Sequence, residues 1–209
     1  MYIEIHQKDE SVSWVELTEL MHEAFQERLE QGLQFTCSFM TAEKLKEQLE
    51  NSTVLVAVDS DSDALVGMAA IDIHDDEKGK WAYMSDLAVT PKYKRCGVMT
   101  HMFQELEDIA KINDCEYIES DTAVGAKSSV KWHKKNGFKI IELYSFKSTN
   151  YYSYIFRKDL TNQPQEGNPL REKLRFWKES LHYRMYNTKT GEKREAKWLD
   201  IYLMLRGAK

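Results

Sequence analysis

Three runs of strand-forming residues follow one another between residues 53 and 89, and short polar turns separate them. The run at 53–59 is continuous and rich in β-branched side chains, and the runs at 64–74 and 81–89 each follow an acidic turn. Adjacent strands that are joined by turns of this length pair in antiparallel fashion. The chain is therefore predicted to build a sheet around these three strands.

Helices and further strands surround this central group. Two predicted helices precede it, one capped by Ser11 or Ser13 and one capped by Thr41. The other predicted elements are a strand at 2–6, a helix at 98–113, a strand at 115–121, a helix at 127–135 and strands at 138–146 and 151–158. A strand, a helix and a strand in succession need a crossover, which makes the strands flanking the first of these helices parallel. The predicted fold class is α+β, with a mixed, mostly antiparallel sheet of six to seven strands flanked by helices.

The connection between the third central strand and the next helix is basic and contains a glycine. Residues 90–99 read TPKYKRCGVM. The first turn of a helix presents unpaired N–H groups and the positive end of the helix dipole. Gly97 would let a phosphate approach the backbone closely, and Lys94 and Arg95 add positive charge. This connection is therefore predicted to bind a diphosphate.

The same connection resembles the acetyl-coenzyme A signature of the GCN5-related N-acetyltransferase (GNAT) family, Arg/Gln-x-x-Gly-x-Gly/Ala. Only Gly97 matches it strictly, because Lys94 replaces the first residue and Met99 stands where the family has a small one. Residues 129–138 look like the family's helix that ends in Tyr-x-x-x-Gly-Phe, with His133 in place of the tyrosine. The element order also suits the family.

The resemblance implies an acyl-CoA-dependent N-acetyltransferase over residues 1–160. Acetyl-CoA would be the co-substrate, no metal would be needed, and a primary amine would attack the thioester directly in a ternary complex. The backbone of Leu87 and Val89 would pair with the pantetheine arm, and a strand N–H near Val89 would polarise the carbonyl. The N–H groups of residues 94–99 would hold the pyrophosphate. The full set of implied cofactor-binding residues is Leu87, Ala88, Val89, Lys94, Arg95, Cys96, Gly97, Val98, Met99 and Thr100.

Two residues are candidates for proton transfer. His133 lies where the family's tyrosine protonates the leaving thiolate, and an imidazole is able to do the same. The alternative is a helix histidine without a catalytic role. Asp86, at the end of the central strand, is the candidate base, with Glu119 and Asp121 on the next strand as further carboxylates. A solvated strand-end aspartate, with a chain of water molecules acting as the base, is the other interpretation.

A second class of function stays open. Met99 in the phosphate turn and the missing tyrosine favour a non-catalytic module of the same fold that binds coenzyme A or a partner. The two classes predict different results, because only an enzyme releases the thiol of coenzyme A when an amine is added.

The C-terminal part of the chain differs in composition from the rest. Residues 161–169 resemble a linker, and residues 170–209 form a predicted basic amphipathic helical extension. The extension holds 11 Lys and Arg against 5 Asp and Glu, whereas the whole chain has a net charge of −5. It could cover the main domain, form a homodimer or lie on an anionic membrane.

Composition also limits the partners. The apolar runs are too short to cross a bilayer, the N-terminus lacks the pattern of a secretory signal, and the 3 cysteines form no disulfide or metal pattern. These features predict a cytoplasmic protein without a metal site. The basic extension could also bind nucleic acid, but a nucleic-acid partner is not expected. The acidic main domain suits a cationic acceptor, such as a small amine or a peptide amine. Aromatic residues that could line the acceptor cleft are Phe35, Phe39, Tyr144, Tyr151 and Tyr152.

Overall fold

A computed structural model describes residues 2–77 and 79–161. The predicted extension at 170–209, and all but the first residue of the predicted linker, lie outside these residues. The described elements are β1 (Ile3–Gln7), α1 (Trp14–Glu30), the 3₁₀ helix η1 (Thr36–Phe39), α2 (Ala42–Gln48), β2 (Thr53–Asp59), β3 (Ala64–Asp76), β4 (Gly79–Val89), the 3₁₀ helix η2 (Pro91–Tyr93), α3 (Val98–Ile112), β5 (Tyr117–Ala123), α4 (Lys127–Lys135), β6 (Lys139–Tyr144) and β7 (Ser153–Asp159). This confirms the predicted order of helices and strands and adds the two 3₁₀ helices.

The strands form a seven-stranded mixed sheet in the order β1-β2-β3-β4-β5-β7-β6. The pairs β1–β2, β2–β3, β3–β4 and β6–β7 are antiparallel, whereas β4 and β5 are parallel as predicted. The chain divides into two compact units, residues 1–119 and residues 120–209, and the division falls within β5. Each unit is therefore described by itself.

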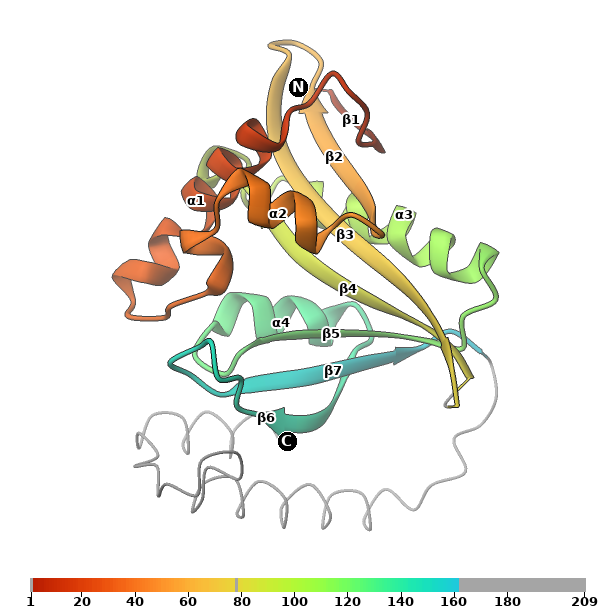
Figure 1. The fold of residues 1–209 in the computed structure, drawn as a ribbon. Coiled ribbons are helices and arrows are strands. Elements are labelled where there is room, and N and C mark those ends of the chain that lie inside the picture. The colour runs from red at the N-terminus through yellow and green to blue at the C-terminus, as the bar shows by residue number, and fades with distance from the viewer. Residues whose placement is uncertain (1, 78, 162–209) are drawn as a thin grey trace. The chain divides into compact units, whose positions relative to one another are not determined.

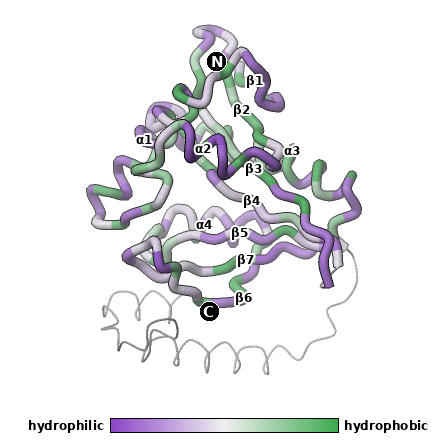
Figure 2. The backbone as a smooth tube through the Cα atoms, viewed as in Figure 1, coloured by the Kyte–Doolittle hydropathy of each residue, from purple (hydrophilic) through white to green (hydrophobic). Residues whose placement is uncertain are grey.

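In the first unit, helices cover both faces of the strands (Figure 1). Leu17 and Met21 of α1 and Leu45 of α2 belong to one buried cluster with Val56 of β2 and Met68 of β3. Side chains alternate between the two faces of a strand. The neighbours of Val56 on β2 and of Met68 on β3 therefore point to the opposite face of the strands, where α3 packs. Figure 2 shows the hydrophobic stretch of β2 and the hydrophilic end of the β3–β4 hairpin.

Local signals in the sequence explain where the first two helices begin. Ser13, rather than Ser11, caps α1: its Oγ accepts the N–H of Glu16 at 3.2 Å, and the carboxylate of Glu16 accepts the N–H of Ser13 at 2.8 Å. This reciprocal pair satisfies two backbone donors at the helix start. Thr41 caps α2 in the simpler way, through the N–H of Lys44, and confirms the prediction.

One glycine lets β3 approach both the end of β4 and the start of α3. A Cβ at Gly67 would lie 3.1 Å from the carbonyl oxygen of Ala88, 3.2 Å from Sδ of Met102 and 3.4 Å from Cγ1 of Val98. The first two separations are tighter than ordinary van der Waals contact, so a side chain here would displace its neighbours by a few tenths of an ångström. The absent side chain thus allows β3 to lie close to the end of β4 and to α3.

In the second unit, β6 and β7 form an antiparallel pair with an irregularity between Ile140 and Glu142. The N–H of Val124, just after β5, donates to the carbonyl oxygen of Tyr152 at 2.8 Å. Tyr154 and Phe156 of β7 are fully buried, and Phe156 stacks on His133 of α4.

Candidate functional site

The end of β4 departs from a regular strand at Asp86. Met68 of β3 is opposite Ala88, and Ala70 is opposite Ser85, so two residues of β4 face the single residue between them. Asp86 is one of those two, and its φ of +51° lies in the left-handed region. An extra residue of this kind is a β-bulge, which bends the strand and redirects a side chain. Regular alternation of side chains along β4 therefore stops at Ser85.

The side chain of Asp86 is held from the second helix. Nε2 of Gln48, in the last turn of α2, donates a hydrogen bond of 2.9 Å to Oδ2 of Asp86. Cys37 of η1 lies close enough for the two groups to interact: burial raises the pKa of its thiol, and the negative charge of Asp86 raises it further. Asp86 is half-buried, so its carboxylate sits at the border of the solvent with α2 and η1 around it.

Sequence reasoning missed Gln48. It is an exposed glutamine on a short helix, 38 positions before its partner, and no local pattern marks such a residue. The hydrogen bond exists because β2 and β3 return the chain from α2 to the end of β4, which is a tertiary effect.

The registers of β4 with its two neighbours differ in length. The register with β5 comprises three pairs, from Trp81 with Tyr117 to Tyr83 with Glu119. The register with β3 continues to Val89. The last two residues of β4, Ala88 and Val89, are therefore paired with β3 but lie beyond the register with β5.

After β4, the chain forms a concave turn of backbone N–H groups. Gly97 is left-handed with a φ of +86°, and Val98 is the first residue of α3. A left-handed residue followed by a right-handed one points three successive N–H groups, here those of Gly97, Val98 and Met99, toward one side, which is an anion-binding arrangement. We call these three residues the nest. Within the described residues, no protein acceptor receives any of these three N–H groups.

Other N–H groups of the predicted pyrophosphate site are bonded inside the protein. The N–H of Lys94 donates to the carbonyl oxygen of Pro91 at 3.3 Å, and that of Cys96 to Tyr93 at 3.4 Å. The N–H of Thr100 donates to Gly97 at 2.9 Å. The N–H groups open to an anion are thus fewer than the stretch 94–100 suggests.

Space and charge at the turn suit an anion. A Cβ at Gly97 would meet only Cε1 of His101, at 3.8 Å, so the surface beside the nest is open. Arg95 is exposed, with a φ of +67°, whereas the ammonium of Lys94 lies 3.0 Å from Oε2 of Glu27 in α1. The hydrogen bond and the charge of Lys94 lower the pKa of Glu27, so the carboxyl of Glu27 stays ionised at neutral pH. Arg95 is therefore the cation best placed to meet a ligand.

His133, in the second unit, has the environment of a core histidine. Its side chain is 3 % exposed and stacks on Phe156 at a centroid distance of 4.5 Å. Nδ1–H donates to the carbonyl oxygen of Ser129 at 2.9 Å, which leaves Nε2 to accept the hydroxyl of Ser120 at 3.2 Å. Burial lowers the pKa of His133 to about 4. The imidazole is therefore neutral at pH 7, with both nitrogens in use.

This burial makes stability depend on pH. The unfolded chain binds a proton at His133 below its ordinary pKa of about 6.5, whereas the native imidazole does so only near pH 4. The contribution of the neutral His133 imidazole to the free energy of unfolding is therefore fully present above pH 6.5 and is lost as the pH falls toward 4. We expect the free energy of unfolding, measured with urea, to drop by about 2 kcal/mol between pH 7 and pH 5. In His133→Gln most of this drop should disappear, and an equal drop in both proteins would contradict the assignment.

The other predicted residues are scattered. Cys96 is exposed beside the nest. Of the aromatic acceptor candidates, Phe39 is 63 % exposed, and Phe35 packs on Phe25 at 5.1 Å. The described part of the chain holds no cluster of His, Cys, Asp and Glu suited to a metal ion, and none of its helices has the length and apolarity needed to span a membrane.

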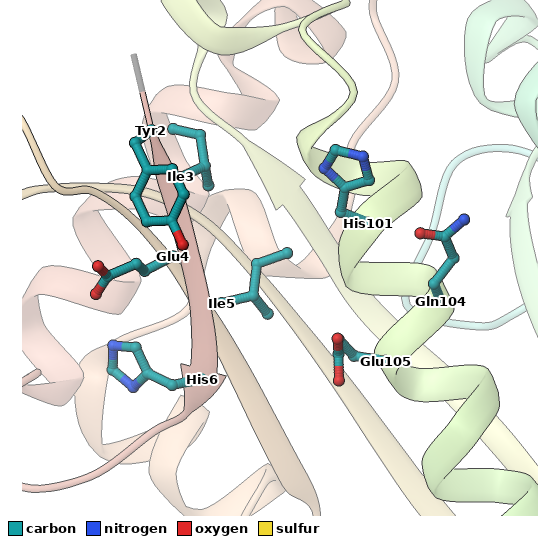
Figure 3. Close-up of a pocket in the computed structure, with 8 residues that line it drawn as sticks. All are labelled: Tyr2, Ile3, Glu4, Ile5, His6, His101, Gln104 and Glu105. Atoms are coloured by element: carbon teal, nitrogen blue, oxygen red, sulfur yellow. The ribbon is translucent and has the colours of Figure 1, made fainter.

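A groove of about 450 Å³ lies elsewhere in the first unit, between β1 and α3 (Figure 3). Ile5 points from β1 toward Glu105 on α3, whereas Glu4 and His6 point away from that helix. None of the predicted site residues lines this groove. Its polar groups do not converge, so the nest and the Asp86 bulge are the stronger candidates for chemistry.

Comparisons with known proteins identify the family of this chain. The model of the family described as the acetyltransferase (GNAT) family matches residues 14–138. A search of curated proteins gives no significant match.

Solved structures resemble the chain in fold. The NatC complex bound to Gag peptide and CoA has a chain with 16 % identity and a TM-score of 0.59, covering 77 % of this chain and 100 % of its own. A GNAT acetyltransferase from Elizabethkingia anophelis with acetyl-CoA bound has 14 % identity and a TM-score of 0.55, covering 76 % and 98 %. The PaiA N-acetyltransferase from Thermoplasma acidophilum in complex with coenzyme A has 20 % identity and a TM-score of 0.57, covering 76 % and 99 %. At these identities the likeness extends to the fold alone.

Proposed function

Because the chain belongs to the acetyltransferase (GNAT) family, we propose that it transfers the acetyl group of acetyl-CoA to a primary amine. The nest at Gly97, Val98 and Met99 is the observation that supports this most, since its open N–H groups fit the diphosphate of coenzyme A. Of the three solved structures described above, two were determined with coenzyme A and one with acetyl-CoA.

The residues take distinct roles in this proposal. The nest and the guanidinium of Arg95 bind the diphosphate, and the backbone of Leu87 and Val89 pairs with the pantetheine arm. Ala88, Lys94, Cys96 and Thr100 shape the same segment, and Lys94 acts through its ion pair with Glu27 rather than on the phosphates. A strand N–H near Val89 polarises the thioester carbonyl, where charge develops during the reaction.

Proton transfer rests on Asp86. The amine nitrogen attacks the carbonyl carbon, the carbon–sulfur bond breaks, and the carboxylate of Asp86 takes the proton that the nitrogen loses. The leaving thiolate takes a proton from water. His133 is left out of this step, because with a pKa of about 4 only about one imidazole in a thousand carries a proton at pH 7. We assign it to the core of the second unit instead.

The acceptor is a cationic amine. Asp86 lies in the same unit as α1, whose sequence is rich in glutamate, and a carboxylate beside the reacting carbon would attract an ammonium before it loses its proton. The NatC structure was determined with a Gag peptide, which favours a peptide amine over a small amine. A cytoplasmic location and a homodimer formed through residues 170–209 stay predictions.

The function is tested by ligand-induced stabilisation and by turnover. Acetyl-CoA at a hundred times its Kd should stabilise the native protein by about 2.7 kcal/mol, and raise the Tm by roughly 5 °C or more. With a panel of peptide amines and small amines, the release of the coenzyme A thiol should follow. No change in Tm at millimolar acetyl-CoA would contradict the proposal.

Met99 favours the second candidate function. Met99 belongs to the nest, and its half-buried side chain stands where the family signature has a small residue. A turn altered in this way would bind coenzyme A without supporting turnover. A non-catalytic module of this kind would show the increase in Tm but would release no thiol with any amine. The same two measurements therefore separate the enzyme from the module.

A further inference from the structure

A buried hydrogen bond joins the end of β2 to the segment that precedes the nest. The hydroxyl of Tyr93, the last residue of η2, donates to Oδ2 of Asp59 at 2.6 Å. Both side chains are almost inaccessible, with 5 % of Tyr93 and 6 % of Asp59 exposed. Short hydrogen bonds from a neutral hydroxyl to a carboxylate are among the stronger ones in proteins, and in a buried setting the loss of one partner is costly.

Asp59 is a rigid anchor. It is the last residue of β2 and lies in register with Ile3 of β1 and with Ala64 of β3. Its Oδ1 accepts the N–H of Asp61 at 3.2 Å. The hydrogen bond from Tyr93 lowers the pKa of the carboxyl, with a further contribution from the N–H of Asp61. Asp59 is therefore ionised and fixed at neutral pH.

Tyr93 connects Asp59 to the turn that precedes α3. The ammonium of Lys92 lies 3.3 Å from the Tyr93 hydroxyl oxygen and donates to it, which leaves the hydroxyl proton for Asp59. The carbonyl oxygen of Tyr93 accepts the N–H of Cys96. One residue thus ties the sheet, through its side chain, to the backbone of the turn that ends at Gly97.

The turn needs such a tie. Arg95 and Gly97 are both left-handed, and this conformation is strained for an arginine relative to the right-handed region. Without an external tie, the segment between β4 and α3 would relax, and the three N–H groups of the nest would no longer be held in position before the ligand arrives.

We propose that Asp59 and Tyr93 are positioning residues, which hold the diphosphate-binding nest in its binding conformation through their mutual hydrogen bond. Neither residue touches the ligand; both act through the turn. This inference rests on the proposed function, because the diphosphate in question is that of acetyl-CoA.

The test compares two thioesters that differ in the diphosphate. In Tyr93→Phe the KM for acetyl-CoA should rise about tenfold, which corresponds to one lost hydrogen bond. The KM for S-acetylpantetheine, which has no diphosphate, and the kcat with either thioester should stay unchanged. Asp59→Asn keeps an oxygen that accepts the Tyr93 hydroxyl, so it should lie between wild type and Tyr93→Phe. Ile71→Val, a buried change on β3, controls for stability loss alone.

Hydrogen exchange of the unliganded protein gives an independent readout. The amides of Arg95 to Met99 should exchange faster in Tyr93→Phe than in wild type or in Ile71→Val. An equal rise in KM for both thioesters, or exchange rates unchanged by Tyr93→Phe, would overturn the positioning role. If wild type fails to bind acetyl-CoA while the exchange rates still respond to Tyr93→Phe, the proposed function fails and the tie between Asp59 and the turn stands.

Discussion

Replacing Asp86 with asparagine should lower kcat by about 10²–10⁴-fold, because the amide that takes its place cannot accept the proton of the amine. Asparagine tolerates the left-handed conformation of this position and can keep the contact with Gln48. The bulge in β4 should therefore survive, and the KM for acetyl-CoA should stay near the wild-type value. Steady-state release of the coenzyme A thiol, with the acceptor and acetyl-CoA varied separately, measures both constants.

A matched control for this change exists in the same unit. Asp63, in the turn between β2 and β3, is also left-handed, with a φ of +53°, and is exposed. Asp63→Asn makes the same chemical change in the same backbone conformation, away from the proposed site, and should leave kcat intact. If Asp86→Asn retained full kcat, Asp86 would not be the base, and a chain of water molecules would be the better account of deprotonation.

Replacing Gly97 with valine should weaken acetyl-CoA binding about 100-fold. A β-branched residue does not adopt a φ near +86°, so the turn must change its conformation and the three N–H groups of the nest must separate. The loss of part of this set of charge-assisted hydrogen bonds, about 3 kcal/mol in all, corresponds to that decrease in affinity. Isothermal titration with acetyl-CoA measures the Kd directly.

Gly32 offers the control for backbone strain. Its φ is +78°, and a Cβ there would meet nothing within 4 Å, which makes its setting close to that of Gly97. Gly32→Val should lower the free energy of unfolding by an amount similar to that for Gly97→Val. Only Gly97→Val should change the Kd. Similar Kd values in the two variants would show that the nest does not bind the diphosphate.

Asp86 and Gly97 also show which features could be predicted from the sequence. The turn at Gly97 could be predicted because a glycine between a strand and a helix, with basic neighbours, is a local pattern that does not depend on distant residues. The order of helices and strands was predictable for the same reason. The capping box at Ser13 and the left-handed turn at Gly32 depend on residues only a few positions apart.

The features that sequence reasoning missed depend on distant residues. Gln48 reaches Asp86 across 38 positions, and Asp59 reaches Tyr93 across 34. The burial of His133 follows from its stacking on Phe156 of another element, whereas its helix taken alone is strongly basic. The bulge at Asp86 arises from a register shift between two strands, each of which has an ordinary strand composition. Sequence patterns and residue propensities depend on near neighbours in the chain, so they do not predict such contacts.

Arg95 carries a consequence for how this protein would evolve. Three of the four described non-glycine residues with a left-handed backbone are aspartates, which tolerate it, and the fourth is Arg95. A glycine at that position would relieve the strain and make the folded state more stable, but it would remove the cation beside the nest. Selection for thermal stability alone would therefore favour glycine at this position at the expense of activity. Selection for turnover would retain the strained arginine.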